Sequence, residues 1–145
     1  MRYIFVVLLI YFLSEAKMIR DEANEVVFDT ATKKMWQDNL MVTDGNYMVS
    51  WEDAIEQCEN LDLAGYTNWR LPNINELNTI ADITMHNPAL SSVFTRYELA
   101  SYWSSTTYSS VGLLNTAWSI DFITANMRPD QPKIDKLYVR CIRDF

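Results

Sequence analysis

The residues with the most reactive side chains in this 145-residue chain are two cysteines and one histidine. Cys58 and Cys141 would form a disulfide in an oxidising compartment, and a reactive or metal-binding thiol pair is the alternative. The disulfide is favoured because no histidine and no third cysteine lies near either position in the sequence. His86 would need a nucleophile or a carboxylate beside it for catalysis, so we expect it to lie in an ordinary loop.

Sequence motifs of common enzymes are absent. The chain has only three glycines and contains no phosphate-binding glycine loop, no Gly-x-Ser-x-Gly and no His-Glu-x-x-His. Acidic residues at 52–59 occupy the polar side of a predicted helix, where solvent exposure explains them better than a metal site. We therefore expect a protein that is not an enzyme and that uses no cofactor and no metal ion.

Aromatic side chains are the first candidates for ligand contact. Trp69, Trp103 and Tyr108 could stack against sugar rings, and burial in the core is the alternative. Trp118 alternates with other apolar residues, which favours the core. The hydroxyl-rich stretch 102–112 is the best candidate for a ligand-binding surface, because exposed hydroxyls and aromatic rings suit both sugars and proteins.

Arg70, Arg140 and Asp121 are the charged candidates for ligand binding. Each arginine could hold an anionic group, or it could brace the end of a sheet by pairing with a carboxylate. Asp121 lies on the opposite face of its predicted strand from Trp118. A pair between Asp121 and Arg140 on a nearby strand is therefore one expected structural use of these charges.

Two helices are expected to position the middle of the chain. The apolar stripe after the capping residue Ser50 predicts a first helix that ends at Gly65, which would supply a left-handed cap. Asn73 and Glu76 have the spacing of a capping box, so a second helix is expected from 74 to about 83.

The N-terminal third contains a predicted hairpin. Short strand signals at 26–28 and 34–37 flank a turn rich in Asp and Thr, whose side chains bond their own backbone. Residues 17–25 before the hairpin are polar, and we expect them to be a loosely held lead-in.

The last third contains mostly strand signals. Aromatic or alternating segments at 101–107, 115–122 and 137–142 predict three strands. An irregular loop is expected at 84–100, and a polar connection with two prolines at 125–135. The chain as a whole predicts an α+β fold, with two helices packed on a mainly antiparallel sheet and with long loops.

The first 16 residues have the pattern of a signal peptide. Arg2 precedes an apolar run at 3–13, and a small-x-small site ends at Ala16. The apolar run is well short of the ~20 residues that span a bilayer. We expect cleavage near Ala16 and export to the periplasm, the cell surface or the medium, without stable membrane insertion. The domain itself is expected at 26–145.

The charge of the chain disfavours nucleic acid as a partner. Its formal net charge is −7, and its basic residues are scattered rather than grouped. Recognition of a polyanion needs a concentrated basic face.

Several short motifs occur in a distinctive order along the chain. In order they are Met35-Trp36-Gln37, Trp51-x-x-Ala54, Cys58-x-x-Leu61, Trp69-Arg70-Leu71-Pro72, Tyr102-Trp103-Ser104-Ser105, Trp118-x-x-Asp121-Phe122 and Tyr138-Val139-Arg140-Cys141. This series, over about 26–143, resembles the Lcl C-terminal domain family of exported bacterial proteins. The resemblance implies a C-type-lectin-like fold, related to the domain of formylglycine-generating enzymes, with a long-range disulfide between Cys58 and Cys141.

The resemblance also implies a function in binding. It suggests lectin-like recognition of a glycan or another cell-surface ligand during bacterial attachment. The calcium-site triplets of sugar-binding C-type lectins are absent from the sequence, so calcium-dependent sugar binding is not expected. The alternative is a structural or assembly module that docks a protein partner in the periplasm or at the cell surface.

Overall fold

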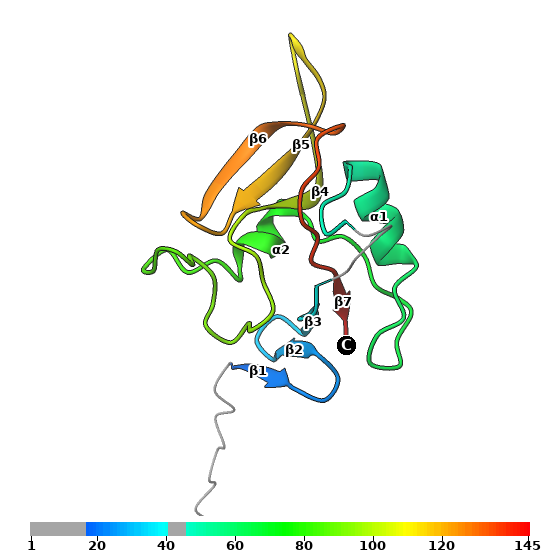
Figure 1. Cartoon of the computed structure of the whole chain (residues 1–145), viewed down its shortest axis with the longest axis vertical. Helices are drawn as coiled ribbons and strands as arrows, with labels where there is room; N and C mark the ends of the chain where they lie inside the picture. The colour runs from blue at the N-terminus through cyan, green and yellow to red at the C-terminus, as the bar shows by residue number, and fades with distance from the viewer. Residues whose placement is uncertain (1–16, 41–45) are drawn as a thin grey trace, which may run out of the picture.

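Two antiparallel sheets and two short helices form the described part of the chain, residues 17–40 and 46–145 of a computed structural model (Figure 1). This arrangement confirms the predicted α+β class. The expected signal peptide at 1–16 lies outside the described residues. No helix among the described residues is long and apolar enough to cross a membrane.

The first sheet joins the N-terminal hairpin to the last strand of the chain. Its strands in spatial order are β1 (Met18–Asp21), β2 (Val26–Asp29), β3 (Lys34–Gln37) and β7 (Ile142–Asp144). The predicted hairpin is confirmed as β2 and β3. The expected loose lead-in contains strand β1 instead, because its backbone pairs with β2 along four residues.

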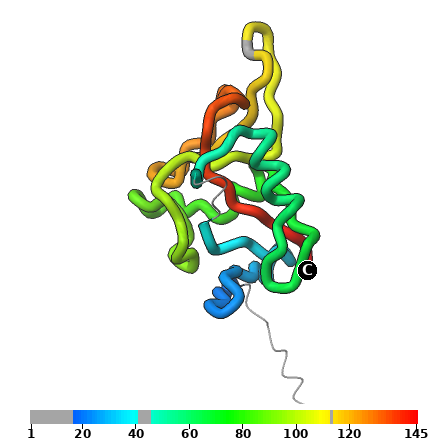
Figure 2. Tube along the Cα trace, turned by 45° about the vertical axis from the view of Figure 1, so that its right-hand side comes forward, coloured from blue at the N-terminus to red at the C-terminus, as the bar shows by residue number. Residues whose placement is uncertain are grey.

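The second sheet consists of β4 (Ser101–Ser110), β5 (Leu113–Asp121) and β6 (Asn126–Pro132). The expected polar connection at 125–135 is wrong, since most of it is β6. Its two prolines are tolerated because β6 is an edge strand that pairs with β5 alone. The β4–β5 hairpin projects beyond the rest of the described chain, as its yellow tip shows in both views (Figures 1 and 2).

Helix α1 (Trp51–Glu59) begins at the predicted cap, where the Ser50 hydroxyl accepts the backbone N–H of Asp53. It ends at Asn60, earlier than expected. Gly65 does not cap it. Instead Ala64 and Gly65, at φ +56° and +79°, form a tight two-residue turn, closed by paired backbone hydrogen bonds between the two flanking residues.

Helix α2 (Ile74–Asn78) is shorter than expected but begins with the predicted capping box. The Asn73 side chain accepts the Glu76 backbone N–H at 2.9 Å, and the Glu76 carboxylate accepts the Asn73 N–H at 3.0 Å. After Asn78 the chain continues in tighter turns with hydrogen bonds between residues three apart.

The predicted strand at 137–142 is divided among three neighbours. Leu137 and Tyr138 make isolated bridges to Val49 and Tyr102, and only from Ile142 does the chain enter the first sheet as β7. The C-terminal segment therefore connects the two sheets instead of extending the second one.

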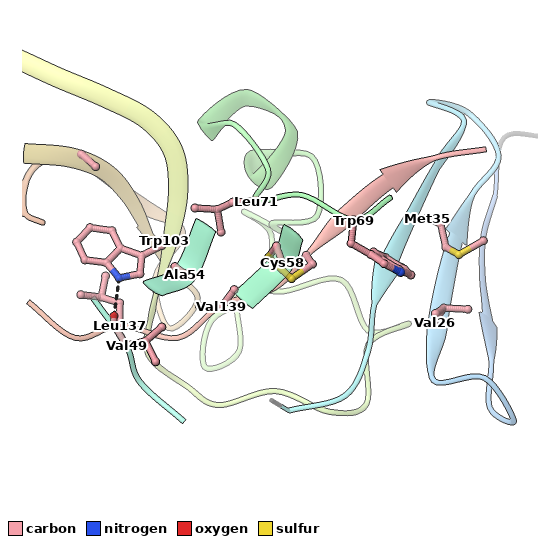
Figure 3. Packing of buried hydrophobic residues seen from close by; sticks show 12 residues of the cluster. Val26, Met35, Val49, Ala54, Cys58, Trp69, Leu71, Trp103, Leu137 and Val139 are labelled. Atoms are coloured by element: carbon pink, nitrogen blue, oxygen red, sulfur yellow. Dashed lines mark hydrogen bonds between the residues drawn. A yellow bond between two sulfur atoms is a disulfide. The ribbon is translucent and has the colours of Figure 1, made fainter. Parts of the chain in front are cut away.

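Two apolar clusters fill the space around the sheets. Successive residues of β4 face different clusters, with Trp103 in the first and Tyr102 in the second. The base of the second sheet is thus buried on both faces. The disulfide between Cys58 and Cys141 lies in the first cluster and ties α1 to the chain just before β7 (Figure 3). This confirms the predicted pairing.

Candidate functional site

Trp69 and Trp103 are core residues and are not available for stacking against a sugar. Their exposed fractions are 2% and 0%. The Trp103 Nε1–H donates to the Val49 carbonyl at 2.9 Å (Figure 3), and the Trp69 Nε1–H donates to the Tyr66 carbonyl at 3.0 Å. Each buried indole therefore has its hydrogen bond inside the protein. The prediction of ligand contact is corrected at both positions.

Tyr108 is the accessible member of the three aromatic candidates. It is half-buried on β4, and its ring makes a T-shaped contact with Trp118 on β5, with centroids 6.0 Å apart and an interplanar angle of 84°. Edge-to-face pairs of this kind add to the stability of a hairpin. The pair leaves one partly exposed aromatic surface on the projecting hairpin.

Arg70 forms a bidentate pair with Glu76. Its two terminal nitrogens donate to the two carboxylate oxygens at 2.8 and 2.7 Å. Glu76 is also the capping-box residue of α2, so the pair connects the segment before α2 to its first turn. Arg70 therefore pairs with a carboxylate, which was the alternative to holding an anionic ligand, and its partner is Glu76.

The stability contributed by this pair depends on pH. Hydrogen bonds from the Arg70 guanidinium hold the pKa of Glu76 below its usual value, although partial burial opposes the shift. Because the native pKa is lowered, the contribution is present above the unfolded-state pKa of about 4.3 and is lost as the pH falls through the native pKa.

We therefore expect Glu76→Gln to weaken the dependence of the free energy of unfolding on pH below about pH 5. Urea unfolding at a series of pH values measures this change. Arg70→Met should flatten the profile in the same way, because it removes the partner. A Glu76→Gln profile that runs parallel to that of the wild type would contradict the assignment.

Arg140 is fully buried and pairs with Asp38, not with Asp121 as expected. Its guanidinium donates to Asp38 at 3.2 Å and to the backbone carbonyls of Gln37 and Arg96. It also lies over the Phe94 ring, 4.6 Å from the centroid. These contacts leave Arg140 out of reach of an external ligand.

Asp38 is the centre of a buried ionic cluster. Besides Arg140, its carboxylate accepts hydrogen bonds from the Arg20 side chain, the Thr95 hydroxyl and the backbone N–H groups of Thr95 and Arg96. The cluster therefore fixes the long loop 84–100 to the first sheet. Sequence reasoning missed Asp38, because its partners lie far away along the chain.

Asp121 has a local role at the end of β5. Its carboxylate accepts the backbone N–H of Ile123 at 2.9 Å and the hydroxyl of Thr124 at 3.1 Å. These bonds shape the turn into β6. The six predicted binding residues thus have different structural roles, and the structure does not assemble them into one accessible site.

The tip of the β4–β5 hairpin lies at the end of the stretch 102–112 that was predicted as a ligand-binding surface, but its most exposed side chains are aliphatic and not the expected hydroxyls and aromatic rings. Val111 is fully exposed and Leu114 is 78% exposed, on either side of the turn at Gly112. Hairpin tips in water are usually polar, so two exposed aliphatic side chains there are unusual. The sequence signal for this feature was the presence of apolar residues on both sides of Gly112.

Within residues 17–40 and 46–145, no group of three or more His, Cys, Asp or Glu side chains is placed to hold a metal ion. The geometry defines a disulfide-linked α+β domain in which Arg70 and Arg140 are paired with carboxylates, and whose β4–β5 hairpin carries two of the most exposed apolar side chains.

The sequence matches the Lcl C-terminal domain over residues 25–143. The chain therefore belongs to this family. A comparison with curated proteins found no matching sequence.

Proposed function

We propose that this chain is a non-enzymatic, exported binding module that docks a protein partner through the tip of its β4–β5 hairpin. The observation that carries the proposal is the exposure of Val111 and Leu114 on a hairpin that stands clear of the domain (Figure 2). Burying such side chains against a partner removes apolar surface from water and is favourable.

Export is supported by two observations. The signal-like sequence at 1–16 has the pattern that directs secretion. The disulfide between Cys58 and Cys141 suits an oxidising compartment such as the periplasm or the cell exterior.

Recognition of a glycan is the second candidate function. It is supported by the half-buried Tyr108–Trp118 pair on the same hairpin, which offers a partly exposed aromatic surface. The burial of Trp69 and Trp103 leaves this candidate with less aromatic surface than expected, which is why protein docking is placed first. A glycan array with wild type and Tyr108→Ala tests it, since specific sugar binding must fall in the variant.

The finer fold assignment is also a proposal. We infer a C-type-lectin-like architecture, related to the domain of formylglycine-generating enzymes. It is supported by family membership, by a disulfide joining the first helix to the chain before the last strand and by the long irregular loop 84–100. A solved structure superposed on lectin-like domains tests it.

A photocrosslinking amino acid at position 114 tests the docking proposal in cells that produce the protein. We expect one specific crosslinked protein, because the side chain at this position would contact the partner. Position 83 is the matched control, since Ile83 is also 78% exposed but lies outside the hairpin. Equal crosslinking at both positions would contradict the proposal.

With the captured partner purified, Leu114→Asp is expected to weaken binding tenfold or more, as at an interface hot spot. The control variant Ile83→Asp should bind as the wild type does. Both variants should keep the melting temperature of the wild type, because both side chains are exposed in the free domain. Unchanged affinity in Leu114→Asp would exclude the hairpin tip as the docking surface.

A further inference from the structure

A pocket lies between the first sheet and helix α2, and residues of β3, β7 and α2 line it. Its volume is about 230 Å³. Its lining residues include Thr32, Lys34, Trp36, Glu76, Thr79 and Ile142. Trp36 and Ile142 are fully buried and form its inner wall, whereas Lys34, Glu76 and Thr79 are partly or fully exposed and form its rim.

The Trp36 indole distinguishes this pocket from the rest of the core. Its Nε1–H is buried and has no hydrogen-bond partner among the described residues. The indoles of Trp51, Trp69 and Trp103 instead donate to backbone carbonyls at 2.8, 3.0 and 2.9 Å. A buried donor without an acceptor is costly, so an acceptor supplied from outside would be bound favourably.

The charges at the rim balance one another. The Lys34 ammonium pairs with Asp144 and lies 3.8 Å from Glu76, which in turn pairs with Arg70. Two cations and two anions leave no net charge to attract an ion. The rim therefore favours an uncharged ligand, and the flexible Lys34 side chain is the group that can move aside to admit it.

The size of the pocket limits the ligand. An apolar cavity of about 150 Å³ accommodates benzene, so 230 Å³ accommodates a ring with a small substituent. We propose that this pocket binds an uncharged, ring-containing small molecule with a carbonyl oxygen that accepts the Trp36 Nε1–H. This site is separate from the hairpin tip and does not depend on the docking function.

Acetophenone and α-methylstyrene are the matched probes, because they share a shape but only acetophenone has the carbonyl oxygen. Titration is followed by the indole N–H resonance of Trp36 in ¹⁵N NMR spectra, identified by its contacts with its cross-strand neighbour Ile142. We expect acetophenone to shift this resonance saturably and to bind about tenfold more tightly than α-methylstyrene, as one hydrogen bond allows.

Variants separate the pocket from non-specific binding. Thr79→Phe should fill the pocket from its exposed rim and abolish the shift, while Thr107→Phe on the exposed side of β4 should leave it unchanged. Trp36→Phe, if folded, should bind both probes equally. An unshifted Trp36 resonance up to the solubility limit, equal affinity of the wild type for both probes, or a shift that survives Thr79→Phe would overturn the proposal.

Discussion

Replacing Asp38 with alanine is expected to lower the free energy of unfolding by about 3–5 kcal/mol, as when one partner of a buried ion pair is removed. The variant leaves the fully buried Arg140 without its carboxylate and removes the acceptor for two backbone N–H groups of the long loop. Equilibrium unfolding in urea, followed by tryptophan fluorescence, measures the loss.

Asp130→Ala is the control, since Asp130 pairs with Arg128 at the surface, where an ion pair contributes at most about 1 kcal/mol. Coupling provides a second check. Asp38→Ala should cost less in an Arg140→Met background, because that background lacks the fully buried Arg140 guanidinium that the change would otherwise leave without its carboxylate. A loss below about 1 kcal/mol in the wild-type background would contradict the central role of Asp38.

Removal of the disulfide is the second change with a large expected effect. Cys58→Ala with Cys141→Ala opens a loop closed across 83 positions of sequence. The chain-entropy model gives a loss on the order of 4 kcal/mol for a loop of this length. Urea unfolding of the double variant measures it.

Reduction of the wild type should produce a similar loss, because it opens the same loop without changing the side chains. Reaction with an alkylating reagent before and after unfolding reports the state of the thiols. Two thiols that react in the native, unreduced protein would contradict the cross-link.

Local signals in the sequence predicted local structure well. The capping box of Asn73 and Glu76 and the cap at Ser50 involve residues three positions apart, so their spacing alone defines them. The two cysteines were similarly decisive, because a chain with one pair has one possible internal disulfide.

Interactions between residues far apart in the sequence were either missed or predicted with the wrong partner. Asp38 meets residues 57 and 102 positions away, which no local pattern reveals. Arg140 consequently received the wrong expected partner. Strand β6 was missed because prolines usually exclude a strand, and only its place at a sheet edge permits them.

The β4–β5 hairpin shows why the exposure of a side chain is hard to predict from the alternation of polar and apolar residues. On a sheet with one exposed face, alternating residues divide into buried and exposed sets. Tyr102 and Trp103 lie where both faces are covered, so both are buried. At the tip of the same hairpin, Val111 and Leu114 are exposed, although apolar side chains are ordinarily predicted to be buried.

The pairing of β3 with β7 has a consequence for biogenesis. The first three strands of that sheet are made early, yet their open edge receives its neighbour only when residues 142–144 have been synthesised. A ribosome delivers the chain from its N-terminal end onward, so the first sheet is complete only after residues 142–144 have emerged. Until then the edge of β3 offers unpaired backbone groups to other chains, and a holding chaperone is the natural protection for this interval.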